Sequence, residues 1–216
     1  MKDLLKQIIL EQQEILHLSD RVYVQRHIED EWLRTTEILI LSGIRRCGKS
    51  VLMQQLRDRL QEKDFFFNFD DERLANFKIE DFQTLQECFY ELFGEQHTYY
   101  FDEIQNIEGW ERYVRRLYNE GNKIIITGSN ARMLSRELGT HLTGRYIQAE
   151  IYPFSFKEYL QMREVALTDK TLYTTAGRAL IMNEFSNYLA NGGFPKYIQE
   201  GSTSYLSSLY ESIIYR

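Results

Sequence analysis

The strongest chemical signal in the chain is one run of eight residues. Residues 43–50 are Gly-Ile-Arg-Arg-Cys-Gly-Lys-Ser, which fit the pattern G-x-x-x-x-G-K-[ST] at every fixed position. Glycines let the backbone curl so that its N–H groups face phosphate oxygens. Lys49 supplies a point charge for the β- and γ-phosphates, and the Ser50 hydroxyl is a hard oxygen ligand suited to Mg²⁺. The run therefore predicts a loop that binds the phosphates of a nucleotide.

The residues expected to contact the nucleotide extend from this loop into the helix that follows it. They are Gly43, Ile44, Arg45, Arg46, Cys47, Gly48, Lys49, Ser50 and Val51. The loop comes directly after an apolar run and opens a helical pattern, which is the context that its mechanism requires. Cys47 allows two interpretations: redox control, or a small residue tolerated at a free position. We favour the second.

Two acids at the end of another apolar run form the second candidate site. Tyr99-Tyr100-Phe101 is followed by Asp102 and Glu103. In phosphate-loop ATPases, which this order of motifs resembles, the first acid holds the Mg²⁺ shell and the second polarises the attacking water. Asp70-Asp71 competes for the metal role, because it also follows an apolar run. We interpret that pair as acids that are solvated or lie near the entrance of the site.

A third run, residues 123–127, ends close to polar groups that suit a phosphate or a water molecule. Thr127, Ser129 and Asn130 can each donate a hydrogen bond there. Chain order does not choose between Ser129 and Asn130 as the sensor of the γ-phosphate. The alternative is an ordinary helix cap made by serine or asparagine.

The elements that must hold these residues alternate between strand and helix. Five apolar runs predict strands at 37–42, 65–69, 98–101, 123–127 and, more weakly, 146–151. Helical patterns fill the gaps at 49–62, 80–93 and 108–120, and an amphipathic helix is expected at 3–17, docked on the core. This alternation predicts an α/β fold with a parallel sheet. After Pro153 we expect helices at 155–163, 177–191 and 203–215, with a breaker at 191–195.

Composition narrows the class of partners. The net charge is −6, which argues against a generally basic nucleic-acid coat. Arg112, Arg115, Arg116 and Lys123 form the best basic cluster, and a solvated helix face is favoured over a nucleic-acid patch. The two cysteines fit a reducing compartment, and no apolar run reaches the roughly 18 residues of a membrane helix. We therefore expect a cytoplasmic protein without a membrane partner.

Six stretches together resemble the AAA-type branch of phosphate-loop ATPases, and more closely a prokaryotic AAA-like subgroup with an uncharacterised C-terminal domain. The stretches are ILSGIRRCGKS (40–50), FFFNFDDERL (65–74), YYFDEIQNIEGWE (99–111), IIITGSNARML (124–134), LTGRYIQAEIYPFSFKEYL (142–160) and NGGFP (191–195). The resemblance implies a five-stranded ATPase core at 35–152, after an N-terminal helical segment at 1–34. It also implies a helical, lid-like region at 153–216 that is cut near its end.

Carried over position by position, the resemblance implies Asp102 and Ser50 as metal ligands. It implies Glu103, Lys49 and either Ser129 or Asn130 as catalytic groups. Arg145 is the first choice for the arginine that such proteins usually receive from a neighbouring copy, with Arg132 and Arg136 as second choices. The expected function is Mg²⁺-dependent ATP binding and hydrolysis coupled to movement of an appended domain. The alternatives are an ATP-sensing module with little turnover, a DNA-associated ATPase and a phosphotransferase.

Overall fold

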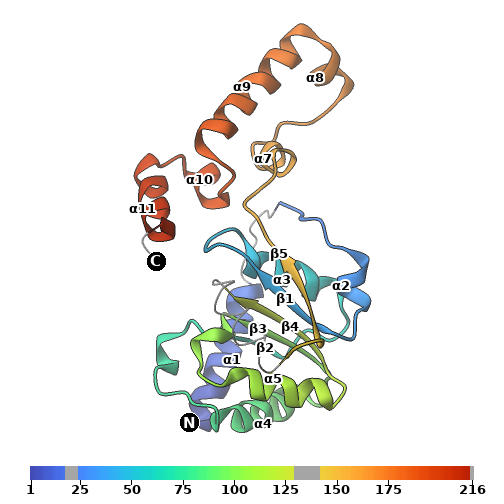
Figure 1. Ribbon diagram of the computed structural model, residues 1–216, viewed down its shortest axis with the longest axis vertical. Helices are drawn as coiled ribbons and strands as arrows, with labels where there is room; N and C mark the ends of the chain where they lie inside the picture. The colour runs from blue at the N-terminus through green and yellow to red at the C-terminus, as the bar shows by residue number, and fades with distance from the viewer. Residues whose placement is uncertain (18–23, 129–141, 215–216) are drawn as a thin grey trace. The chain divides into compact units, whose positions relative to one another are not determined.

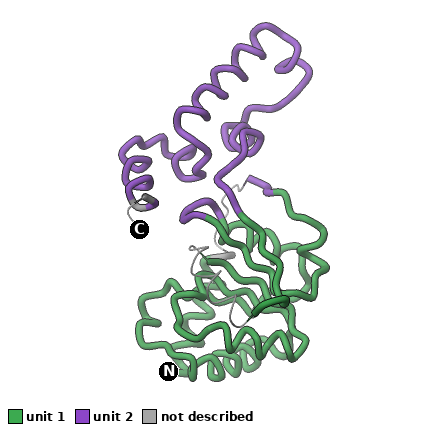
Figure 2. The backbone as a smooth tube through the Cα atoms, in the orientation of Figure 1, with its two compact units in different colours: residues 1–21, 27–43, 49–150 green, residues 22–26, 44–48, 151–216 purple. Residues whose placement is uncertain are grey.

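A computed structural model describes residues 1–17, 24–128 and 142–214 of the chain (Figure 1). Contacts divide the chain into two compact units (Figure 2). Unit 1 comprises residues 1–21, 27–43 and 49–150, and unit 2 comprises residues 22–26, 44–48 and 151–216. Among the described helices, none is both long enough and apolar enough to cross a membrane.

Unit 1 is built on a five-stranded sheet in the order β2-β3-β4-β1-β5. The strands are β1 Ile38–Ser42, β2 Phe66–Asn68, β3 Thr98–Asp102, β4 Lys123–Gly128 and β5 Tyr146–Glu150. All neighbouring pairs are parallel. Their near-continuous apolar residues suit strands that are covered on both faces. The predicted parallel α/β fold is thus confirmed.

Helices cover both faces of this sheet (Figure 1). They are α1 Lys2–His17, α2 Asp30–Arg34, α3 Lys49–Arg59, α4 Asp81–Phe93 and α5 Trp110–Asn119, with 3₁₀ turns η1 Glu72–Leu74 and η2 Ile104–Asn106. Helices α1, α4 and α5 share one core cluster with alternate strand residues such as Phe67 and Phe101. On the opposite face, Arg57 of α3 lies over the rings of Phe66 and Tyr100, at 4.7 and 5.5 Å. The docking expected for the first helix is confirmed.

Strand register brings the sequence motifs to one edge of the sheet. Phe101 is paired with Ile126, and Leu41 is paired with Thr127. Asp102 and Thr127 therefore end neighbouring strands, and the phosphate loop leaves β1 at the same carboxyl edge. The carboxyl edge of an open parallel sheet is where ligands of such folds bind.

Unit 2 is mainly helical. Its helices are α7 Phe156–Met162, α8 Asp169–Tyr173, α9 Thr175–Asn191, α10 Pro195–Glu200 and α11 Thr203–Ile214. Helix α7 begins with a capping box made by Ser155 and Glu158. The N–H of Phe154 donates to the carbonyl of Gly193 at 2.7 Å. A side chain at Gly193 would lie 2.1 Å from the Phe154 carbonyl oxygen, so only glycine permits this approach.

The differences from the predicted elements concern short helices and helix ends. The sequence patterns missed α2, α8 and α10, which have five or six residues and are too short to show helical periodicity. Helix α3 ends at Arg59, three residues before the predicted end. There the chain folds back, and Nε of Arg57 donates to the carbonyl of Lys63 at 3.0 Å. The breaker at 191–195 is confirmed, since it joins α9 to α10.

Candidate nucleotide site

The phosphate loop has the backbone conformation that its glycines allow. Gly48 has φ of 100°, in the region that favours glycine, and Arg46 also has a positive φ of 65°. Lys49 is the first residue of α3, and its buried side chain donates from Nζ to the carbonyl of Gly43 at 3.2 Å. The lysine amine is therefore folded back over the start of the loop.

Three polar side chains meet at the carboxyl edge of unit 1. The Thr127 hydroxyl donates to Oδ1 of Asp102, and the Ser50 hydroxyl also hydrogen-bonds the Asp102 carboxyl group. Ser50 belongs to the first turn of α3, so the helix after the loop and the end of β3 are brought together. The structure therefore places the two residues predicted to hold Mg²⁺ side by side, and both offer the hard oxygens that this ion prefers.

Burial sets the electrostatic character of Asp102. Desolvation raises the pKa of its carboxyl group above the usual value; the hydrogen bonds from Thr127 and Ser50 and the charge of Lys49 offset only part of this rise, and the charge of Glu103 adds to it. A buried carboxylate is costly unless it is paired or coordinates a cation. A divalent cation at this position would compensate for that cost.

Glu103 stands at the turn directly after β3. Its backbone is left-handed, with φ of 53° and ψ of 37°, and its N–H donates to the Thr127 hydroxyl at 3.0 Å. Its carboxylate accepts a hydrogen bond from Nε2 of Gln105 at 2.6 Å. A left-handed residue other than glycine is uncommon and is found preferentially at functional sites. Thr127, which the sequence suggested for phosphate or water, donates to the Asp102 carboxyl group and accepts from the backbone N–H of Glu103.

The competing acids Asp70 and Asp71 serve the local fold. Asp71 accepts from Nε and Nη2 of Arg73 at 2.9 and 2.7 Å, and the Arg73 contact lowers the pKa of Asp71. The same arginine reaches Glu11 of α1 at 2.6 Å. The N–H of Asp70 donates to Oδ1 of Asn68 at 2.8 Å, and its carboxylate accepts from Nδ2 of Asn106 at 3.4 Å. These contacts tie the end of β2 to its surroundings.

Arg145 lies at the amino ends of the parallel strands, whereas the phosphate loop follows the carboxyl end of β1. Its carbonyl accepts from the N–H of Ile38, the first residue of β1, and β5 begins one residue later. Glu150 ends the same strand, about 17 Å away at the usual rise per residue. The arginine is therefore separated from its own loop by the length of a strand. Ser129, Asn130, Arg132 and Arg136 lie outside the described residues.

Two members of the basic cluster, Lys123 and Arg116, make contacts within unit 1. Nζ of Lys123 donates to the carbonyls of Trp32 and Thr35 at 3.2 and 2.9 Å, at the end of α2. Arg116 pairs with Glu120 and also donates to Gln86 at 3.1 Å. These contacts favour a structural role for Lys123 and Arg116.

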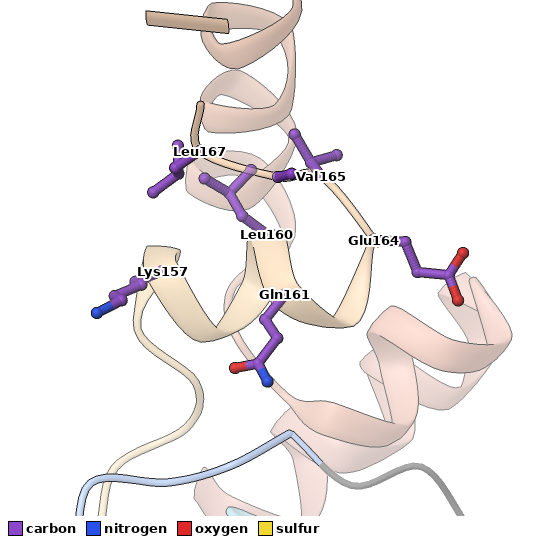
Figure 3. A pocket seen from close by; sticks show the side chains of 7 residues that line it. Lys157, Leu160, Gln161, Glu164, Val165 and Leu167 are labelled. Atoms are coloured by element: carbon purple, nitrogen blue, oxygen red, sulfur yellow. The ribbon is translucent and has the colours of Figure 1, made fainter. Parts of the chain in front are cut away.

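A hollow of about 380 Å³ lies in unit 2 beside α7. Leu160, Val165 and Leu167 gather on one side of it, whereas Lys157 and Glu164 point outward at its flanks (Figure 3). The hollow has the apolar lining of a packing surface and lacks the convergent donors that a phosphate needs.

Comparison with known proteins agrees with this geometry. The profile of the family described as AAA domain matches residues 35–160. An uncharacterized protein of Methanocaldococcus jannaschii, MJ1544, is 33% identical over 196 residues, covering 90% of this chain and 43% of the relative. An uncharacterized protein of Haemophilus influenzae is 36% identical over 210 residues, covering 91% of this chain and 49% of the relative. The chain thus spans less than half the length of these relatives.

A solved structure gives the same fold at low sequence identity. Hsp104, in its closed state with ATPyS and FITC casein, aligns with a TM-score of 0.52 and 14% identity. The alignment covers 96% of this chain and 40% of the Hsp104 chain. The likeness concerns the fold alone, whereas the family profile spans the phosphate loop, the acidic strand end and β5. The chain belongs to the AAA domain family, with the parallel-sheet core of a phosphate-loop ATPase.

Proposed function

We propose that the chain binds ATP with Mg²⁺ at residues 43–51 and hydrolyses it. We further propose that hydrolysis moves the helical region at 153–216. The observation that carries the proposal is the meeting of Ser50, Asp102 and Thr127 next to Glu103. A phosphate loop alone serves many chemistries, but a buried acid bonded to the loop serine is suited to a metal–nucleotide complex.

Each residue has a distinct role in this proposal. Lys49 and the loop N–H groups bind the phosphates, and Mg²⁺, when bound at Ser50 and Asp102, would neutralise phosphate charge. Glu103 accepts a proton from water as the water oxygen attacks the γ-phosphorus and the bond to the ADP oxygen breaks. Thr127 orients the Asp102 carboxyl group and holds the backbone of Glu103 through its hydroxyl.

A binding and turnover experiment tests the assignment. Lys49→Ala should weaken MgATP binding by roughly 10- to 100-fold, the range of a lost charge-assisted hydrogen bond. Glu103→Gln should retain binding and lower turnover by about 10²–10⁴-fold. The exposed Glu108 provides a matched control, because Glu108→Gln changes a nearby carboxylate that no role requires. Unchanged calorimetric affinity in Lys49→Ala would refute the binding site.

Phosphoryl transfer spreads negative charge over the γ-phosphate, and an arginine can stabilise that charge. We propose that Arg145 supplies this positive charge to the nucleotide of a neighbouring copy. Its position at the amino edge of the sheet supports action between copies rather than within one chain. The rate per chain should therefore rise with protein concentration. Arg145→Ala should lower the maximal rate per chain, reached at high protein concentration, by up to about 10³-fold and leave ATP affinity unchanged. The exposed Arg112 gives the control variant Arg112→Ala. A fast rate that depends neither on protein concentration nor on Arg145 would contradict the proposal.

A second candidate function is ATP sensing with slow turnover. The hydrogen bond from Gln105 to the Glu103 carboxylate favours it, because that bond occupies the proposed base. Gln105→Ala distinguishes the two functions: it should raise multiple-turnover phosphate release if the bond restrains Glu103.

A further inference from the structure

We infer that Arg26 is a positioning residue for the phosphate loop and couples that loop to helix α7. The inference rests on the proposed nucleotide function and names a part of the site that no sequence motif marks. Arg26 lies outside the loop, in the short segment before α2, and its side chain is only 10% exposed. All the contacts that carry the argument lie within unit 2.

The guanidinium of Arg26 directs its donors to three different chain segments. Nη1 donates to the carbonyl of Cys47 in the phosphate loop at 2.9 Å. Nη2 donates to the carbonyl of Tyr152, and Nε donates to Oε1 of Glu158 at 3.0 Å. The guanidinium also lies over the ring of Phe154, at 5.3 Å from its centre. A planar group with donors in a fixed fork holds such partners in a defined geometry, which a lysine does not reproduce.

The contact with Cys47 fixes one peptide plane of the loop. In a planar trans peptide, the carbonyl of Cys47 and the N–H of Gly48 point in opposite directions. Because the carbonyl points to Arg26, the Gly48 N–H points away from that positive charge. A loop N–H oriented in this way is free of competition from the arginine and available to an anion. Arg26 thus selects the peptide orientation that a phosphate requires.

The contact with Glu158 joins this loop peptide to the start of α7. Glu158 uses its two carboxylate oxygens differently: Oε1 accepts from Arg26, and Oε2 accepts from the N–H and hydroxyl of Ser155 at 2.7 and 2.8 Å. The same carboxylate therefore caps α7 and holds the arginine. A displacement of the Cys47 carbonyl would strain the cap, and a displacement of α7 would release the loop peptide.

Cys47 and Gly48 have the environment that this role requires. The side chain of Cys47 is fully buried. A Cβ added at Gly48 would lie 3.5 Å from Nη1 of Arg26, in addition to the strain of its positive φ. The loop and the arginine are packed at close range.

The test measures MgADP affinity with a fluorescent ADP analogue, beside the thermal unfolding midpoint. Arg26→Ala should weaken MgADP binding by about tenfold or more, because a charge-assisted hydrogen bond to the loop is lost. Arg26→Lys should recover only part of the affinity. Millimolar guanidinium should restore binding to Arg26→Ala, while tetramethylammonium at equal concentration should not. Glu158→Gln should weaken binding in the wild-type background and have no added effect in Arg26→Ala.

Arg73→Ala is the matched control. Arg73 also forms ion pairs with two acids, Asp71 and Glu11, but none of its partners lies in the loop. It should leave MgADP affinity unchanged. If wild-type protein binds MgADP and Arg26→Ala binds it equally well, the inference about Arg26 fails and the proposed function stands. If affinity and unfolding midpoint both fall and guanidinium restores neither, the role is merely structural and the inference also fails. Absence of binding by wild-type protein would overturn the proposed function itself.

Discussion

The two units differ in the size of the apolar cluster that each buries. Unit 1 buries stacked aromatic rings: Phe65 and Phe89 are 4.9 Å apart, and Phe82 and Tyr113 are 4.3 Å apart. In unit 2, helix α9 buries a carboxylate, Glu184, which is 6% exposed. The same helix exposes large apolar side chains, including Leu189 at 68% and Met182 at 61%.

This difference indicates how each unit keeps its shape. The aromatic core of unit 1 is stabilised by the hydrophobic effect, which does not depend on any one directional contact. Unit 2 has a smaller apolar cluster, around Phe154, Tyr159 and Leu160, and depends more on specific hydrogen bonds. Tyr159 donates to Glu184 at 2.8 Å, and Tyr188 donates to the carbonyl of Phe154 at 2.8 Å. Regions with few buried apolar contacts open at lower free energy, and we expect unit 2 to be the adjustable part.

The largest expected effect comes from removing one aromatic ring from each unit. Phe89→Ala should lower the free energy of unfolding of unit 1 by about 3–5 kcal/mol, because a fully buried ring leaves a cavity. Phe185→Ala in α9 should cost about 1 kcal/mol or less, since that ring is 37% exposed. Hydrogen exchange, which follows each unit separately, measures both values. Equal losses would contradict the distinction between the units.

An intermediate effect is expected from the buried acid of unit 2. Glu184→Ala leaves the Tyr159 hydroxyl without its acceptor and should destabilise α7 and α9 by about 1–3 kcal/mol. Glu184→Gln keeps an acceptor oxygen and loses only the charge that faces Arg163 at 3.6 Å, so its effect should be smaller. Faster exchange in α7 and α9, with no change in the sheet of unit 1, is the expected result. Similar effects of the two variants would mean that the hydrogen bond contributes little.

Much of unit 1 was predictable, because its signals are local. Apolar runs marked the strands, and polar residues directly after them marked the carboxyl edge. The meeting of Asp102 with Ser50 followed from the order of motifs. Strand order also places Asp70-Asp71 far from the loop, since β2 is the outermost strand and two strands separate it from β1. The sequence patterns did not reveal that order.

Unit 2 and Arg26 were harder to predict for a physical reason. Arg26 and Glu158 are 132 residues apart, and no spacing rule connects them. The burial of Glu184 reverses the usual preference for apolar residues, so the helical pattern of α9 did not show which face is covered. Thr127 was recognised as polar at the right place, but its bonds to the Asp102 carboxyl group and the Glu103 backbone depend on strand register. Long-range polar contacts are therefore what the sequence conceals.

The smallest expected effect concerns a polar network of unit 1, formed by Asp71, Arg73 and Glu11. Its removal tests whether unit 1, like unit 2, depends on specific polar contacts. Asp71 is paired with Arg73, whose hydrogen bonds hold the pKa of Asp71 below the unfolded value of about 3.9. A lowered folded pKa contributes stability above the unfolded pKa, and this contribution is lost as the pH falls through the folded value. Asp71→Asn should therefore reduce stability at neutral pH by about 1 kcal/mol or less, as for pairs near the surface. The gap between variant and wild type should close towards pH 2, and added salt should narrow it at neutral pH. Thermal unfolding from neutral to acid pH measures this gap. A loss as large as that of Glu184→Ala would show that unit 1 also depends on specific polar contacts, and the contrast between the two units would then fail.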